Sequence, residues 1–356
     1  MLYITTRDKT DAFTAKRTVS SHRGPDGGMY VPFRMPSFTH EEILAMKDRS
    51  FNQNVADVLN LFFGCSLTAW DLEFAGGKQP AKLVANNFRV VFAENWHNQY
   101  NDLSWMIQQL FDRVSGEKGN EPTQWFAIAV RIACLFANFA ELLRDGSVDF
   151  DHPADVAVAT CDFSAPMAVW YGKAMGLPVA TIICSCNENS GVWDLIHQGQ
   201  IHTDALAIQT ALPDANHAVP AHLERLIFGV FGYEENQRYL DCCRRGKIYS
   251  LDDEMAETLR DGIFSAVVSK KRMEGVIHSA MRSGSYLMDP YTAIAFGGLQ
   301  DYRAKTGGSR MALILSDRSP LEMASVVSQA LGVSQEELHR LADKGEARGY
   351  GSLRDR

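Results

Sequence analysis

The chain has 356 residues, of which 46% are hydrophobic and 22% are charged, and this ordinary globular composition excludes a disordered protein. Asp and Glu number 43 against 35 for Lys and Arg, and the net charge of −8 disfavours nucleic acid or an anionic membrane as the main partner. The length suits one large or two moderate domains. We expect no signal peptide and no membrane-spanning segment, because even the most apolar stretch carries Arg131, Asn138 and Glu141.

The cysteines of the chain are expected to be free thiols. Their number, seven, is odd, and their spacing is scattered. The two close pairs, Cys184 with Cys186 and Cys242 with Cys243, lack the Cys-x-x-Cys spacing or the His partners of a metal site. We therefore expect a reducing, cytoplasmic location and no bound metal.

Residues 1–85 are predicted to form a small N-terminal domain. Within it, Thr39 and Glu42 have the spacing of a capping box, which predicts a helix that runs through Met46. Apolar residues on one side of the segment at 54–63 predict a second helix.

The core, residues 86–345, is predicted to begin with a strand at 89–93 and a helix at 102–114. A long helix at 122–143 follows, with a proline in its first turn. Because this helix is apolar nearly all round, we expect it to be buried. The polar tail at 346–356 is expected to be flexible.

The clearest unit of the core is a strand at 155–160, a helix at 165–175 and a strand at 179–184. This spacing implies parallel strands joined by a right-handed crossover. Ligands of such sheets bind at the carboxyl ends of the strands. The turn at 161–164 and the segment at 187–189 are therefore candidate ligand-binding positions.

The rest of the chain is predicted to be mainly helical. A further strand at 311–315 ends just before Asp317, which places this carboxylate at the same sheet edge as the turn at 161–164. The predicted helices cover about 219–230, 236–245, 251–261, 269–283 and 290–304. Together these elements predict an α/β fold with a parallel sheet core.

Four stretches of the chain carry, in the correct order, motifs of one enzyme family. They are Tyr3–Pro36, Ala174–Asn189, Leu223–Phe228 and Leu287–Ala293. In these motifs the sequence resembles the threonine synthases, which are fold-type II pyridoxal-phosphate enzymes. The resemblance implies a sheet core like that of the tryptophan synthase β subunit, together with a small N-terminal domain.

The position of the family's catalytic lysine differs. In the family, a Trp/Phe-His-Gly-Pro-Thr run leads to the lysine that forms the Schiff base with the cofactor. Here the run starts as Glu94-Asn95-Trp96-His97, but the lysine position falls on Ser104, and no lysine lies between Lys82 and Lys118. A Schiff base needs a primary amine, which serine lacks.

The family's phosphate-binding turn differs as well. The family has Gly-Asn-Phe-Gly, and this chain has Cys161-Asp162-Phe163-Ser164, so both glycines are replaced. Asp162 adds a negative charge where the cofactor phosphate would sit. Asp317 falls where the family has a hydroxyl residue near the pyridine nitrogen. We therefore expect no bound cofactor, although pyridoxal phosphate is the cofactor of the family.

The chain is also short for the family it resembles. The family's Ser-Gly-Asp-Thr-Gly loop and a small α/β lobe bind substrate, whereas here only a short loop separates the helix at 102–114 from Trp125. We interpret this as a deleted lobe. The deletion would expose apolar surface, which a homodimer could cover.

Other interpretations stay open for single residues. His97 is expected to be a hydrogen-bonded structural residue. Asp162 and Asp317 could converge for acid–base work or for a divalent cation, but we favour caps of the helices that follow them. His197 and His202 are five residues apart, as are His217 and His222, and they are interpreted as unrelated packing or surface residues. No residue is assigned to catalysis, and the ligand-binding candidates are His97, Asn98, Asn101, Asp102, Ser104, Asp162, Phe163, Ser164, Asn187, Asn189 and Asp317.

Three functions are compatible with these observations. The first, which the lost lysine, turn and lobe favour, is a threonine-synthase-like pseudoenzyme that binds a small metabolite or a partner. The second is a diverged enzyme that uses His97, Asp102, Asp162 and Asp317 for another reaction. The third is residual threonine synthase activity on O-phosphohomoserine through another lysine, such as Lys173.

Overall fold

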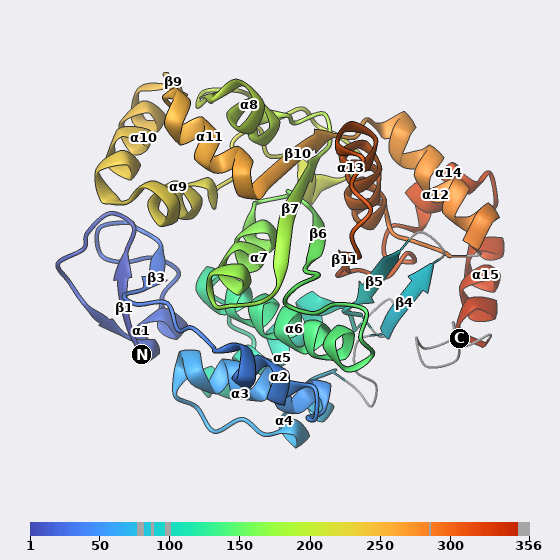
Figure 1. The fold of residues 1–356 in the computed structure, drawn as a ribbon, viewed down its shortest axis with the longest axis horizontal. Coiled ribbons are helices and arrows are strands. Elements are labelled where there is room, and N and C mark those ends of the chain that lie inside the picture. Colours follow the sequence, from blue (N-terminus) through green and yellow to red (C-terminus); the bar gives the residue numbers. More distant parts are fainter. Residues whose placement is uncertain (77–81, 87–88, 97–100, 285, 348–356) are drawn as a thin grey trace.

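The structure is a computed structural model that describes residues 1–76, 82–86, 89–96, 101–284 and 286–347 (Figure 1). Within these ranges the strands are β1 (Leu2–Thr5), β2 (Phe13–Thr14), β3 (Tyr30–Pro32), β4 (Lys82–Asn86), β5 (Val90–Glu94), β6 (Ala154–Ala159), β7 (Val179–Cys186), β8 (Gln200–His202), β9 (Ile248–Ser250), β10 (Ile263–Val267) and β11 (Ala312–Ser316). The helices are α1 (Ala15–Ser20), α2 (His40–Met46), α3 (Phe51–Phe63), α4 (Ala69–Gly76), α5 (Leu103–Ser115), α6 (Gln124–Arg144), α7 (Ser164–Ala174), α8 (Gly191–Gln198), α9 (Leu223–Phe231), α10 (Tyr233–Arg245), α11 (Asp253–Gly262), α12 (Lys270–Gly284), α13 (Pro290–Thr306), α14 (Ala324–Leu331) and α15 (Gln335–Ala347), with a 3-10 turn at Pro213–Ala215.

The main sheet confirms the predicted α/β class with a parallel core. Its described strands have the order β10-β7-β6-β11-β5-β4, and all neighbours are parallel except β4, which is antiparallel to β5. The main sheet therefore includes Lys82, which precedes the predicted domain boundary at residue 85. β1 pairs with β2 and β3 in a separate N-terminal sheet.

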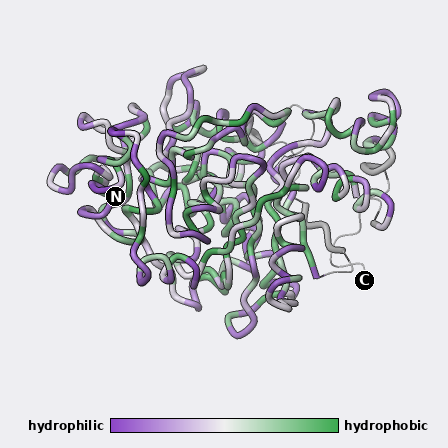
Figure 2. Tube along the Cα trace, turned by 90° about the horizontal axis from the view of Figure 1, so that it is seen from above, coloured by the Kyte–Doolittle hydropathy of each residue, from purple (hydrophilic) through white to green (hydrophobic). Residues whose placement is uncertain are grey.

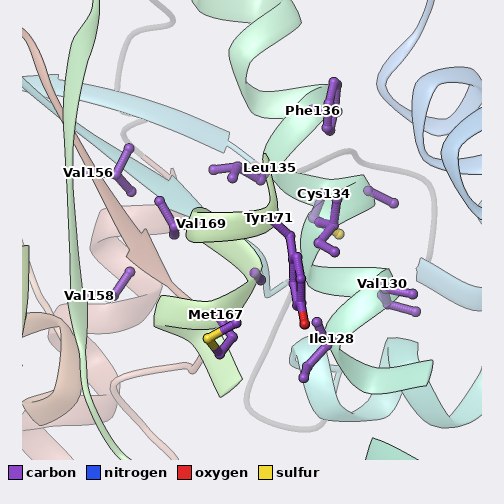
Figure 3. Close-up of a cluster of buried hydrophobic side chains, with 14 of the residues drawn as sticks. Ile128, Val130, Cys134, Leu135, Phe136, Val156, Val158, Met167, Val169 and Tyr171 are labelled. Atoms are coloured by element: carbon purple, nitrogen blue, oxygen red, sulfur yellow. The ribbon is translucent and has the colours of Figure 1, made fainter. Parts of the chain in front are cut away.

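Alternate residues of the parallel strands pack into two different cores. On β6, Val156 and Val158 face the helices α6 and α7, as Figure 3 shows, whereas Ala157 belongs to the core on the opposite face, which α13 covers. This period of two follows from strand geometry. Because both faces are buried, the strands read in the sequence as continuous apolar runs. Figure 2 shows hydrophobic segments running through the interior of the molecule.

Helix α6 corrects the expectation that no segment of the chain is long and apolar enough to span a membrane. With 21 residues it is long and apolar enough to cross a membrane by length and composition alone. In the structure 83% of its most apolar window is buried, which is how a core helix of a folded domain behaves. Its N-cap is Thr123, whose side chain accepts the Phe126 N–H, so the predicted start at Pro122 is wrong by two residues.

Specific hydrogen bonds hold the parts of the N-terminal region together. The predicted capping box of Thr39 and Glu42 is present at the start of α2. The buried Tyr3 hydroxyl on β1 donates to the Phe62 carbonyl at the end of α3 at 2.7 Å. The N-terminal sheet and the helices that follow it are therefore tied to each other.

Candidate functional site

The carboxyl ends of β5, β6 and β11 lie at one edge of the main sheet. Asn95 follows β5, Asp317 follows β11, and the turn that contains Asp162 follows β6. This is the edge at which parallel sheets bind their ligands. We define the strand-end site as Asn95, Arg131, Asp162, His222 and Asp317.

Asp317 forms an ion pair instead of a helix cap. Its Oδ2 accepts a hydrogen bond of 2.6 Å from Arg131 Nη1 on α6, and its Oδ1 accepts one of 2.9 Å from Asn95 Nδ2. The side chains of Arg131 and Asp317 are only 19% and 21% exposed, so water screens this pair little. Asn138 donates to Asn95 Oδ1 at 3.2 Å and orients that amide. The capping interpretation of Asp317 is therefore wrong.

The turn after β6 has a left-handed backbone at two residues that are not glycine. Cys161 has φ of +42° and Phe163 has φ of +73°. Such a conformation costs about 1–3 kcal/mol for a residue with a side chain. The Phe163 ring is 1% exposed and packs in the core on the α7 side, so its burial offsets part of this cost.

Asp162 does not occupy the N-cap position of α7, which is Phe163, but its carboxylate binds the first residue of that helix. Its Oδ1 accepts the Ser164 backbone N–H at 2.9 Å and the Ser164 hydroxyl at 2.6 Å. The carboxylate therefore lies at the positive end of the α7 dipole, where helices bind anions. Its side chain is 41% exposed, so one side of this carboxylate faces solvent.

His222 is a buried link between Arg225 and Asp162. Its Nδ1 faces Arg225 Nη1 at hydrogen-bond distance, and because a guanidinium only donates, this nitrogen accepts. Its Nε2 then carries the proton and faces Asp162 Oδ2 at 3.3 Å. Burial and the Arg225 charge lower the pKa of His222, which agrees with a neutral ring. Burial raises the pKa of Asp162, but the hydrogen bonds from His222 and Ser164 outweigh it and hold that pKa below its usual range.

The same network reaches the N-terminal sheet. Arg225 is fully buried and donates to the Tyr30 carbonyl at 3.3 Å, and burial lowers its pKa to about 10. The adjacent Glu224 accepts two hydrogen bonds from Arg7, at 3.0 and 2.9 Å. His222, which its spacing suggested to be an unrelated packing residue, is therefore part of a chain of contacts from the strand-end site to the N-terminal sheet.

The start of α5 lies next to Asp317. The Leu103 N–H donates to the Asp317 carbonyl at 3.2 Å, and Asp102 Oδ1 caps α5 by accepting a backbone N–H at 2.8 Å. Ser104, which the resemblance predicts at the position of the family's lysine, is exposed on the first helical turn, and Asn101 is partly buried before it. The structure thus brings Asp102 and Asp317 near each other through the backbone of α5.

The remaining candidates act elsewhere or are not described. Asn189 Oδ1 accepts the Ile208 N–H at 2.8 Å and its Nδ2 donates to the Ile208 carbonyl at 3.0 Å. Asn187 Oδ1 accepts the Asn189 N–H at 2.9 Å, so both residues hold the loop after β8. The predictions for His97 and Asn98 fall outside the described residues. Across the described ranges, no group of three His, Cys, Asp or Glu side chains is placed to hold a metal ion.

Sequence comparison finds similarity to threonine synthases. Residues 2–75 match the family model for the threonine synthase N terminus. The chain is 24% identical to human threonine synthase-like 1 over 183 residues, which are 48% of this chain and 23% of that protein. It therefore spans about a quarter of the length of the first curated relatives it matches.

A bacterial relative matches over nearly the whole chain. Threonine synthase of Pseudomonas aeruginosa is 22% identical over 440 aligned residues, which cover 94% of this chain and 91% of the relative. Because 94% of 356 residues is about 335, about 100 of the 440 aligned positions have no counterpart in this chain.

Solved structures show the same fold. The PLP-bound threonine synthase of Brucella melitensis superposes with a TM-score of 0.82 at 17% identity and covers 94% of this chain and 92% of that one. Yeast threonine synthase gives a TM-score of 0.80 at 15% identity and covers 96% and 94%. The predicted fold-type II architecture is therefore confirmed.

Proposed function

We propose that the chain is a pseudoenzyme of the threonine synthase family, one that binds a small metabolite or a partner without pyridoxal-phosphate chemistry. The observation that carries this proposal is the Asp162 carboxylate at the amino end of α7, held there by Ser164 and His222. In the family, the corresponding turn receives the cofactor phosphate.

The residues of this turn do not fit a phosphate group. A bound phosphate would need the N–H groups at the start of α7, and the Ser164 N–H is already bonded to Asp162. The low pKa of Asp162 keeps this carboxylate charged at neutral pH, so a phosphate dianion would meet a like charge. The side chain of Asp162 takes the place of the anion that the turn would otherwise bind.

The positions that would hold the rest of the cofactor do not fit either. Ser104 provides no amine for a Schiff base. Asp317, which could have paired with a ring nitrogen, is neutralised by Arg131 instead. Lys173 donates to the Ala180 carbonyl at 2.6 Å near the start of β7, about 15 Å along α7 from the strand ends. These contacts support the absence of pyridoxal chemistry.

A diverged enzyme is the second candidate. The half-exposed Asp162 next to the neutral His222 favours it, because a carboxylate with a histidine partner can hold or pass a proton. Residual threonine synthase activity would need a lysine that reaches the strand ends, and Lys173 points to the opposite edge.

Two further expectations accompany the proposal. A cytoplasmic location is supported by the free state of all seven cysteines. A homodimer would cover the surface left by the missing lobe, and light scattering that gives a monomer at every concentration would contradict it.

The test of the proposal is cofactor binding. Purified protein mixed with pyridoxal phosphate should give no internal-aldimine absorption band and no adduct after borohydride reduction, whereas the threonine synthase of Brucella melitensis, treated in the same way, serves as the positive control. A stoichiometric reduced adduct at any one lysine would refute the pseudoenzyme. Turnover of another substrate that Asp162→Asn and His222→Gln both abolish would favour the diverged enzyme.

A further inference from the structure

A pocket lies on the α13 side of the main sheet, between α12, α13, α14 and the loop after β8. Its volume is about 390 Å³, which falls in the range of small-molecule sites. Its lining residues are different from those of the strand-end site. Its floor consists of buried apolar side chains, namely Leu212, Val268, Met273, Ile294 and Val326.

The rim of this pocket carries one carboxylate and one ammonium group. Glu188 follows β7, and its Oε1 accepts the backbone N–H of Lys270 at 2.8 Å, so the partner of this carboxylate there is a neutral group. The Lys270 side chain is 55% exposed, and its ammonium lies 3.8 Å from Glu274 Oε1, beyond hydrogen-bond length. A ligand at this rim can therefore reach the Glu188 carboxylate, and it can reach the Lys270 ammonium in exchange for the long ion pair with Glu274.

An exposed apolar side chain completes the rim. Ile208 lines the pocket and is 53% exposed, although Asn189 fixes its backbone with two hydrogen bonds. A ligand in the pocket would cover this side chain and remove its apolar surface from water. The pocket is thus preformed, with an apolar floor, an apolar side chain at the rim and two opposite charges.

We propose that this pocket binds a free α-amino acid with an aliphatic or aromatic side chain. The ligand's ammonium group pairs with Glu188, its carboxylate pairs with Lys270, and its side chain packs on the floor against Met273 and Ile294. A fatty acid or a simple amine would satisfy only one of the two rim charges. A zwitterion with an apolar body satisfies both charges and the floor together.

This site is separate from the strand-end site, so the inference stands independently of whether the protein binds pyridoxal phosphate. The floor residues belong to the core on the α13 face, whereas Phe163 of the strand-end turn belongs to the core on the α7 face.

Isothermal titration calorimetry of the full chain with L-leucine and L-phenylalanine tests the proposal. We expect saturable binding of at least one of them, and binding at least about tenfold weaker for 4-methylpentanoate, which lacks the ammonium, and for 3-methylbutylamine, which lacks the carboxylate. Absence of saturable heat with both amino acids up to about 10 mM would overturn the proposal. Equal affinity for the charge-deleted compounds would overturn it as well.

Variants locate the binding to this pocket. Glu188→Gln keeps an acceptor for the Lys270 N–H but loses the charge, and should weaken binding about tenfold. Lys270→Met should do the same, whereas Lys271→Met, the same charge change outside the pocket lining, should not. Ala211→Trp, at an exposed lining position, should fill the pocket and abolish binding while circular dichroism stays native. Unchanged affinity in Glu188→Gln and Ala211→Trp would place the ligand elsewhere and overturn the assignment.

Discussion

Acid should weaken the contacts around His222, and glutamine in its place should remove that effect. The neutral ring accepts from Arg225 at Nδ1 and faces Asp162 with Nε2. A proton on Nδ1 would meet the guanidinium in place of that hydrogen bond. His222→Gln keeps one acceptor and one N–H donor but has no proton to gain near neutral pH.

The direction and size of the effect follow from the lowered pKa of His222. An unfolded histidine has a pKa of about 6.5, and burial together with Arg225 lowers the pKa in the folded protein. Below about pH 6.5 the unfolded state therefore binds a proton that the folded state does not, so the free energy of unfolding falls as the pH falls. One proton gives a slope of at most about 1.4 kcal/mol per pH unit. Asp162, whose folded pKa is also lowered, acts in the same direction only below about pH 4.

Urea unfolding followed by circular dichroism at about pH 7.5, 6.5 and 5.5 measures this slope. His152→Gln is the matched control, because the His152 side chain is 84% exposed. We expect the wild type and His152→Gln to lose stability in parallel on acidification, and His222→Gln to lose about 1 kcal/mol less between pH 6.5 and 5.5. Equal losses in His222→Gln and the wild type, or a wild type that gains stability at pH 5.5, would refute a neutral His222.

Arg131→Met should lower the free energy of unfolding by about 1–3 kcal/mol, because it leaves the Asp317 carboxylate without its cation. Adding Asp317→Asn should recover part of this loss, and a double variant as unstable in urea as the single one would contradict the pairing. Cys161→Gly should raise the free energy of unfolding by about 0.5 kcal/mol, because relief of the left-handed backbone exceeds the added entropy of the unfolded chain. A lower stability of this variant in thermal unfolding would argue against strain in this turn. Ser104→Lys should form no threonine from O-phosphohomoserine, because Asp162 stays at the phosphate position, and measurable product would overturn this account.

The elements that could be predicted from the sequence are those with local causes. The Thr39 and Glu42 capping box defines the first residue of α2, and apolar runs identify β5, β6, β7 and β11. β10 was not predicted, because Ser265 interrupts its apolar run and its strand identity depends on pairing with β7, far away in the chain. β4 was missed although its partner β5 is the next strand in the chain, because its strand identity depends on that pairing.

In the candidate site, too, contacts between neighbouring residues could be predicted from the sequence, whereas pairs far apart in the chain could not. The hydrogen bond between Asp162 and the Ser164 N–H involves residues two apart and follows from the local sequence. Arg131 and Asp317 are 186 residues apart, so no local pattern could pair them. A signal for a partner did exist: a lone arginine in a helix expected to be buried needs a counter-ion. Sequence reasoning could therefore have flagged Arg131 as paired without identifying Asp317.

The charges of the strand-end site are balanced within the chain itself. A site built around a phosphate and then emptied would leave helix N–H groups and a buried counter-charge without partners, which destabilises a fold. Here the Asp162 carboxylate satisfies the start of α7, and the Arg131 guanidinium neutralises Asp317. In the proposed pseudoenzyme, Asp162 and the Arg131–Asp317 pair together remove the need for an anionic ligand at this site. Under the proposed function, this internal compensation lets the fold persist without the cofactor. Asp162→Ala, which removes the acceptor of the Ser164 N–H, should destabilise the chain and at the same time reopen an anion site at α7.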